Sequence, residues 1–161
     1  MTPATIHEAS ARERLQIIQN AHSVALVGVS ANPLRSSNFV ATYLVRTQLR
    51  AYPVNPAYDE VLGLKSFPSL KALPEAPDVV VVFRRPEAIP GVVDEAIEVG
   101  ASVVWLQLGL RHDEAAQRAL DAGLKVVQNR CLKIEHARFS GRLHLAGFDT
   151  GVVTSKRRRP I

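Results

Sequence analysis

Short apolar runs alternate with amphipathic segments along most of this chain, and this alternation limits the folds it can adopt. Runs rich in β-branched residues predict five strands, at 23–29, 51–54, 78–83, 102–106 and 124–127. Helical spacing predicts helices at 37–49, 86–99 and 112–122, and a helical turn at 69–73. Apolar strands separated by helices form a parallel sheet covered on both faces. We expect an α/β, Rossmann-like fold, a doubly wound parallel sheet of about five strands.

The domain organisation follows from length and from where this alternation stops. A chain of 161 residues suits one domain, which we place at residues 1–140. It opens with an amphipathic helix at about 5–19, and the stretch from the second strand to Lys65 is predicted as a loop. Residues 141–161 are rich in Gly, Thr and Arg, and we expect them to form a flexible basic tail.

Charge and cysteine content exclude several classes of function. The net charge is +5, and the cluster 156–159 supplies four positive charges, so we expect a solvated tail and not a nucleic-acid surface. The only cysteine, Cys131, excludes an internal disulfide and a multi-cysteine metal site. With neither a secretory leader nor an apolar run of the roughly 20 residues that a membrane span needs, we expect a cytoplasmic protein. Homodimerisation is left open.

The end of the first predicted strand has the properties of a phosphate site. In parallel α/β sheets, ligands bind beyond the carboxyl ends of the strands. Gly28 lets the chain turn sharply and lets a ligand approach the backbone. The next helix, capped by Ser36 or Ser37, offers free N–H groups and a positive dipole end. We therefore expect a diphosphate to bind here.

A dinucleotide cofactor is the main alternative, and the sequence disfavours it. The G-x-G-x-x-G fingerprint requires glycines where Ser30 and Pro33 stand. An acidic residue should end the second strand to bind ribose, but Val54, Asn55 and Pro56 stand there and form a wall that suits an adenine ring. A small NAD(P)-binding oxidoreductase remains the alternative function.

The other strand ends carry an aromatic ring, guanidinium groups and amides. Phe83 ends the third predicted strand, and Arg84 follows it. An aromatic ring stacks on a base there, and a guanidinium group pairs with phosphate. The alternative is that Phe83 is a core residue and Arg84 is exposed to solvent. Arg35 reaches the same edge from the first loop. Gln107 and Asn129 end the last two strands, and either binds an amide-containing ligand arm or caps the following helix.

No arrangement of side chains predicts catalysis or metal binding. The sequence shows no nucleophile with a base, no paired carboxylates and no cluster of metal ligands. A helix start at Cys131 would favour a reactive thiol, but inert buried cysteines are common. His136 and His144 have no second ligand at metal spacing. We expect a protein that is not an enzyme.

Five segments in βα register carry a family resemblance. They are V-G-V-S-A-N-P-L-R-S-S, Y-P-V-N-P, V-F-R-R-P, V-W-L-Q-L-G-L and V-Q-N-R-C-L-K. From about Val24 to Phe139 the chain resembles the small bacterial and archaeal CoA-binding domain proteins, whose fold is shared with the CoA-binding part of the succinyl-CoA synthetase alpha subunit. The phosphohistidine domain of that subunit and its carboxylate-activating partner have no counterpart here, so its ligase activity is not expected.

The resemblance implies coenzyme A, free or as an acyl-CoA, as the ligand. It implies that the diphosphate lies over the loop after the first strand, that the adenosine end lies at the second and third strand ends, and that pantetheine runs toward the last two. The residues implied are Gly28, Val29, Ser30, Pro33, Arg35, Ser37, Val54, Asn55, Pro56, Phe83, Arg84, Gln107, Gly109, Asn129 and Cys131. Asn129 and Cys131 would lie nearest the thiol.

Overall fold

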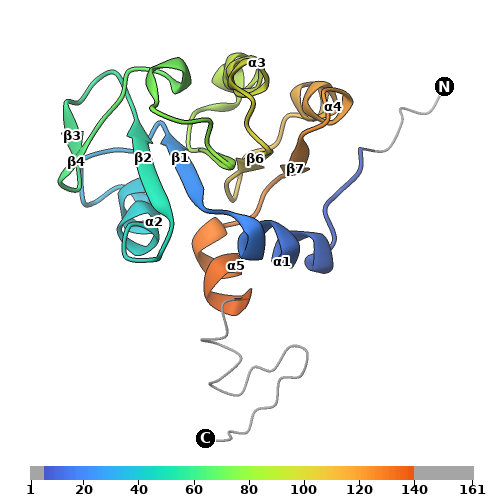
Figure 1. Ribbon diagram of the computed structural model, residues 1–161, viewed down its shortest axis with the longest axis horizontal. Coiled ribbons are helices and arrows are strands. Elements are labelled where there is room, and N and C mark those ends of the chain that lie inside the picture. The colour runs from blue at the N-terminus through green and yellow to red at the C-terminus, as the bar shows by residue number, and fades with distance from the viewer. Residues whose placement is uncertain (1–5, 140–161) are drawn as a thin grey trace, which may run out of the picture.

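A five-stranded parallel sheet forms the centre of the protein, as a computed structural model shows for residues 6–139 (Figure 1). Its strands are β1 (Ser23–Val27), β2 (Arg50–Val54), β5 (Val79–Val82), β6 (Val103–Leu106) and β7 (Lys125–Val127). Their order in the sheet is β2-β1-β5-β6-β7, and all neighbouring pairs are parallel. The predicted α/β fold class is confirmed.

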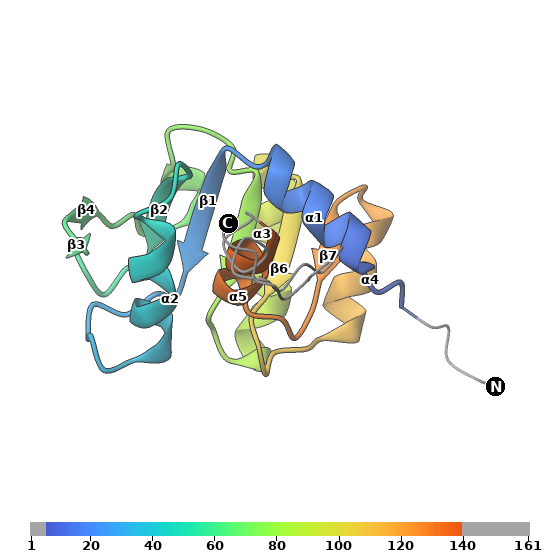
Figure 2. The same ribbon diagram turned by 90° about the horizontal axis from the view of Figure 1, so that it is seen from below.

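Helices cover both faces of this sheet. They are α1 (Ala11–Asn20), α2 (Ser36–Leu44), α3 (Ile89–Val99), α4 (Asp113–Asp121) and α5 (Leu132–Phe139), with the 3₁₀ helices η1 (Leu70–Ala72) and η2 (Pro86–Ala88). Figure 1 shows α3 and α4 on one face and α1, α2 and α5 on the other. Seen from below, α5 lies between α2 and α1 (Figure 2).

Each strand contributes side chains to two cores, one on each face. Ala25 and Val27 of β1 pack toward α3 and α4, whereas Val24 and Leu26 pack toward α1, α2 and α5. All residues of β1, β5 and β6 are buried, including Trp105 at 0% exposure. This two-sided burial explains why the strands are continuous apolar runs in the sequence.

The order of the strands opens a crevice at one edge of the sheet. From β1 the chain passes to β2 on one side, and the next strand of the sheet, β5, lies on the other side of β1. Such a reversal leaves a crevice between the carboxyl ends of the two strands. Val27 pairs with Val82, and the Phe83 N–H donates to the Val27 carbonyl oxygen at 2.9 Å, so Gly28 and Phe83 lie beside each other.

Two predicted helix starts differ from the structure because of local capping. Helix α1 begins at Ala11 and not near residue 5, since Ser10 accepts a hydrogen bond from the Glu13 N–H and donates its own N–H to the Glu13 carboxylate. Neither predicted serine caps α2: Arg35 is the N-cap, without a side-chain bond. Helix α2 also ends at Leu44, five residues before the predicted end.

One element was absent from the prediction, and another was predicted only by its start. The antiparallel hairpin of β3 (Glu60–Val61) and β4 (Leu64–Lys65) lies in the predicted loop, and its turn residues Leu62 and Gly63 both have positive φ, as a two-residue hairpin turn requires. Helix α5 was predicted only as a helix start at Cys131, without its extent. It packs against α1 through a buried ion pair, in which Arg14 Nε lies 2.6 Å from Glu135 Oε1.

The edge strand β2 is held by an exposed charge network that should respond to acid. Arg50 and Tyr52 both donate to the Glu75 carboxylate, and the Arg50 guanidinium, followed by the Tyr52 hydroxyl, lowers the pKa of Glu75 from 4.5 to about 2. A carboxylate with a lowered pKa stabilises the fold above its ordinary pKa, and this contribution is lost as the pH falls through the lowered value.

We therefore expect Glu75→Gln to flatten the decline of stability between pH 4.5 and pH 2. Urea midpoints measured across this pH range for the wild type and the variant test this expectation. A decline of unchanged steepness in the variant would contradict it.

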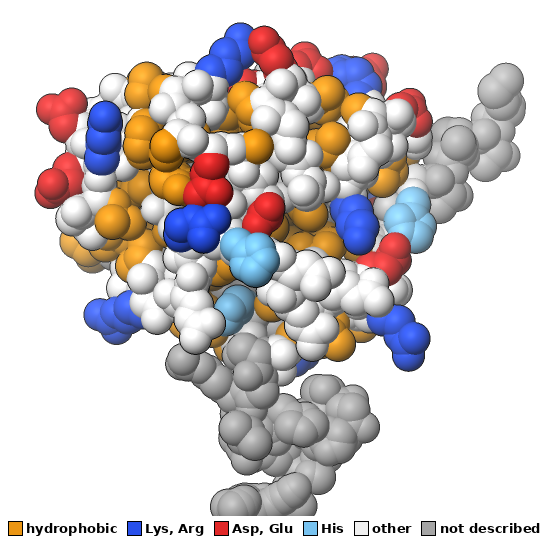
Figure 3. All heavy atoms as spheres, viewed as in Figure 1, with side chains coloured by type: hydrophobic (Ala, Val, Ile, Leu, Met, Phe, Trp, Pro, Cys, Tyr) orange, Lys and Arg blue, Asp and Glu red, His pale blue; other side chains and the backbone are white. Residues whose placement is uncertain are grey.

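Charges of both signs are interspersed over the face in view in Figure 3. Among residues 6–139, no helix is both long and apolar enough to cross a membrane. The basic cluster 156–159, the predicted tail and His144 lie outside the described residues, so the predictions that rest on them stay predictions.

Candidate ligand-binding site

Gly28 lies at the edge of the sheet where the crevice opens. Its φ of 87° favours glycine. A Cβ added at this position would lie 2.6 Å from Arg84 Cδ and 3.4 Å from the Arg84 backbone nitrogen. The position therefore needs glycine both for its conformation and for the close approach of the segment that follows β5.

The loop between β1 and α2 is fixed by its own hydrogen bonds. The Ser30 N–H donates to Ser37 Oγ at 3.0 Å, and Asn38 Nδ2 donates to the Ser30 carbonyl oxygen at 2.8 Å. The N–H groups of Ser36 and Ser37, in the first turn of α2, have no acceptor among residues 6–139. They combine with the positive end of the helix dipole to make a preformed place for an anion.

A cavity of about 630 Å³ lies at this edge of the sheet, between the β1–α2 loop, the ends of β5 and β6, and α5. Seven of the predicted site residues line it: Gly28, Ser30, Arg35, Ser37, Phe83, Gln107 and Cys131. Six residues outside the predicted set of site residues complete the lining: Leu34, Ser36, Val40, Leu108, Leu110 and Ile134. The volume is in the range of small-molecule and cofactor sites.

Gln107 brings a free hydrogen-bond donor to this cavity. It is only 7% exposed, and its Oε1 accepts a hydrogen bond from the Leu132 N–H at 2.9 Å. Its Nε2 has no acceptor within the described part of the chain. A buried amide N–H without a partner costs free energy, so a ligand with an amide or carbonyl oxygen would be stabilised here.

A smaller cavity of about 260 Å³ lies on the other side of Gly28 and is lined by the predicted residues Val54, Pro56 and Arg84. Among its other lining residues are Pro68, Ser69 and Glu95. Arg84 belongs to this cavity and packs against Gly28, which lines the larger one, so its side chain lies at the junction of the two. In the described residues neither Arg35 nor Arg84 forms an ion pair.

Five predicted residues line neither cavity, and four of them form hydrogen bonds within the surrounding loops. Asn55 Nδ2 donates to the Val29 carbonyl oxygen at 2.9 Å, and Val29 itself is fully buried in the core. Asn129, at a positive φ of 58°, accepts a hydrogen bond from the Gly109 N–H at 2.7 Å. Pro33 is exposed. Contact of these residues with a ligand stays a prediction.

The lining of the larger cavity combines polar, apolar and cationic side chains. Its lining offers cationic, hydroxyl and amide groups and one half-buried thiol, Cys131, but no His, Asp or Glu. Over residues 6–139, no three His, Cys, Asp or Glu side chains gather in a way that could hold a metal ion. The described cavity therefore holds no side chain of the types that most often act as a general base.

Comparison with known proteins identifies the family of this chain. Residues 22–137 match the family model described as the CoA binding domain. The uncharacterized protein YneT of Bacillus subtilis is 40% identical over 128 residues, covering 80% of this chain and 95% of YneT. A solved structure of a hypothetical protein from Pyrococcus horikoshii OT3 has a TM-score of 0.80 and 38% identity, covering 88% of this chain and 100% of that one.

A segment of a larger enzyme is also related. The ADP-forming acetate–CoA ligase I of Archaeoglobus fulgidus is 26% identical over 119 residues, which are 68% of this chain but only 17% of the ligase. The resemblance seen in the sequence segments is thereby confirmed over most of the described residues. The chain belongs to the CoA-binding domain family.

Proposed function

We propose that this protein binds coenzyme A across the crevice between β1 and β5, and that it catalyses no reaction on it alone. The observation that carries the proposal is the contact at Gly28, which lines the larger cavity, with Arg84, which lines the smaller one and forms no ion pair within residues 6–139, beside the unpartnered backbone N–H groups of the first turn of α2. An elongated ligand with a diphosphate at its middle suits this arrangement better than a compact one.

The successive parts of a CoA molecule match successive parts of the crevice. The diphosphate lies at the first turn of α2, where Arg35 supplies a positive charge. The adenosine end lies in the smaller cavity beside Val54 and Pro56. Pantetheine runs along the larger cavity, where Gln107 Nε2 donates to an amide oxygen of the arm.

A nicotinamide dinucleotide fits this crevice less well. Its ribose is usually bound by an acidic residue at the end of the second strand, and here that place is held by Asn55, whose amide is engaged with the Val29 carbonyl. Ser30 stands where the fingerprint has its second glycine. Catalysis by this chain alone is disfavoured because the larger cavity presents no His, Asp or Glu.

Calorimetric titration of the full chain with CoA, dephospho-CoA, NAD and ATP tests the proposal. We expect saturable heat with CoA, weaker binding of ATP, and none of NAD. Absence of heat and of any thermal shift with CoA would remove the proposal. Binding of NAD with reduction of its nicotinamide by a supplied substrate would favour the oxidoreductase alternative instead.

The two arginines at the crevice should each contribute to affinity. We expect Arg35→Ala and Arg84→Ala each to weaken CoA binding by about 1–3 kcal/mol, the usual contribution of a hydrogen bond to a charged group. Arg46→Ala is the matched control, because Arg46 is exposed and lines a different hollow. The same titration measures all three variants, and an unchanged affinity for either crevice variant excludes that arginine from the phosphate site.

A further inference from the structure

Large apolar side chains are exposed to solvent around the larger cavity. Leu34 is 90% exposed, Leu108 65% and Ile134 49%, and all three line that cavity. Contiguous apolar surface that faces water marks a place where something binds. The backbone N–H groups of α2, the Arg35 guanidinium and the Gln107 amide suit the polar parts of CoA. Contacts to these polar groups would leave the three apolar side chains exposed to water.

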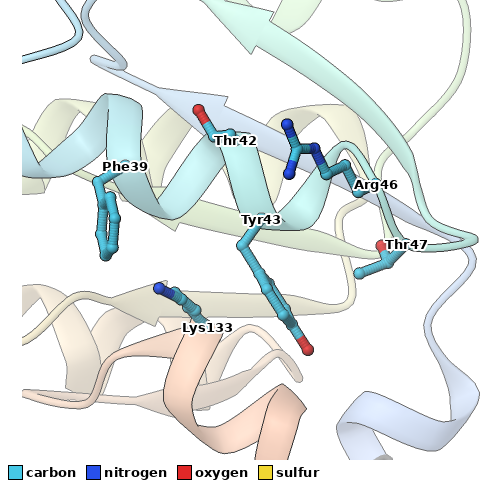
Figure 4. Close-up of a pocket in the computed structure, with 6 residues that line it drawn as sticks. All are labelled: Phe39, Thr42, Tyr43, Arg46, Thr47 and Lys133. Carbon is cyan, nitrogen blue, oxygen red and sulfur yellow. The ribbon is translucent and has the colours of Figure 1, made fainter.

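The other two exposed large hydrophobic residues of the described chain have a different setting. Phe39, at 63% exposure, lines a separate hollow of about 260 Å³ between α2 and α5, where Lys133 Nζ lies 3.7 Å from its ring centroid (Figure 4). Its ring is therefore covered by a cation. Leu62, at 38%, is in the turn of the β3–β4 hairpin. Neither residue lines the larger cavity.

Two of the exposed side chains, Leu108 and Ile134, lie next to the position where we expect the end of the pantetheine arm. Leu108 directly follows Gln107. Ile134 lies three residues after Cys131 at the start of α5, and a spacing of three places side chains near one face of a helix. The partly buried Phe83 and Leu110 belong to the same lining and extend its apolar area.

We infer that the preferred ligand is a CoA thioester with a medium-length hydrocarbon acyl group, which covers Leu108 and Ile134. The inference rests on the proposed function, because the acyl group is positioned by the bound CoA. Free CoA ends in a thiol and leaves this apolar surface in water, whereas an acyl chain buries it. The absence of charged groups other than Arg35 from the lining matches an uncharged chain better than a dicarboxylic acyl group.

The affinity should therefore rise with chain length. A fully buried methylene contributes about a fourfold gain in affinity, and a half-covered one about twofold. We expect hexanoyl-CoA to bind at least about tenfold more tightly than acetyl-CoA, because four methylenes are added. Succinyl-CoA, with its carboxylate, should bind no better than acetyl-CoA.

Calorimetric titration of the full chain with CoA, acetyl-CoA, hexanoyl-CoA and succinyl-CoA measures this series. Binding of all of them with equal affinity overturns the acyl-group inference and leaves the proposed function intact. Binding of none, CoA included, removes the proposed function itself. The two failures are thus distinguished by the behaviour of free CoA in the same experiment.

Two variants locate the effect. Leu108→Ser and Ile134→Ser change exposed side chains of the cavity lining and should reduce the ratio of hexanoyl-CoA affinity to acetyl-CoA affinity to a few-fold. Leu62→Ser, an exposed apolar residue outside the cavity, is the matched control and should retain the full gain. If sedimentation instead shows a dimer that Leu108→Ser dissociates, with no dependence on chain length, the surface is covered by a second copy and the inference is wrong.

Discussion

Replacing Gly28 with alanine will weaken CoA binding about 10- to 150-fold, the range expected when hydrogen bonds to a charged phosphate are lost. The added methyl group would lie 2.6 Å from Arg84 Cδ, so the Arg84 side chain must leave the junction of the two cavities. The methyl group also stands where the backbone would meet the diphosphate. Titration with CoA measures the loss directly.

The same substitution will destabilise the fold, because alanine at a φ of 87° costs about 1–2 kcal/mol. Gly123→Ala separates the two effects. Gly123 has a φ of 91° with no heavy atom within 4 Å of an added Cβ, and it lies at the opposite edge of the sheet. We expect Gly123→Ala to lose similar stability and no CoA affinity. Equal CoA binding by both variants would show that the backbone at Gly28 does not contact the ligand.

Breaking the buried ion pair between α1 and α5 will lower the free energy of unfolding by about 3–5 kcal/mol, as expected when one charge is left buried without its partner. Glu135→Ala is the direct test, since the Arg14 and Glu135 side chains are 8% and 4% exposed and 2.6 Å apart. The Arg14 guanidinium would keep only its bond to the Ala9 carbonyl oxygen, at 2.7 Å. Urea unfolding measures the change.

Two further variants control this prediction. The exposed pair of Lys71 and Glu98 is 3.1 Å apart, and Glu98→Ala should cost no more than about 1 kcal/mol. The double variant Arg14→Met with Glu135→Leu removes both buried charges and should restore most of the stability lost by the single change. A single variant as stable as the wild type would show that the pair does not hold α5 in place.

The strands could be predicted because their burial leaves a local signal. The residues of β1, β5 and β6 are buried on both faces, so each reads as an unbroken apolar run. The β3–β4 hairpin has strands of two residues, too short for a period of two to appear. The extent of helix α5 was missed because the buried Glu135 is paired with Arg14, a residue 121 positions away.

The site could be predicted only where the strand-end rule applies. That rule pointed to Gly28, Phe83 and Gln107, which do meet at one edge. It could not tell ligand contacts from supports, and the side chain of Asn55 turned out to bond the backbone of the neighbouring loop. Leu108 and Ile134 carry no such signal, because an apolar residue in a loop or short helix is usually read as part of the core.

The oxygen and the nitrogen of the Gln107 amide differ in their hydrogen bonding. Its oxygen accepts the first N–H of α5, its nitrogen has no acceptor within residues 6–139, and the side chain lines the larger cavity. In a conjugated amide, a hydrogen bond accepted from the nitrogen shifts electron density toward the oxygen and makes that oxygen a stronger acceptor. A ligand that accepts from Gln107 Nε2 would thereby strengthen the hydrogen bond that Gln107 Oε1 accepts at the start of α5.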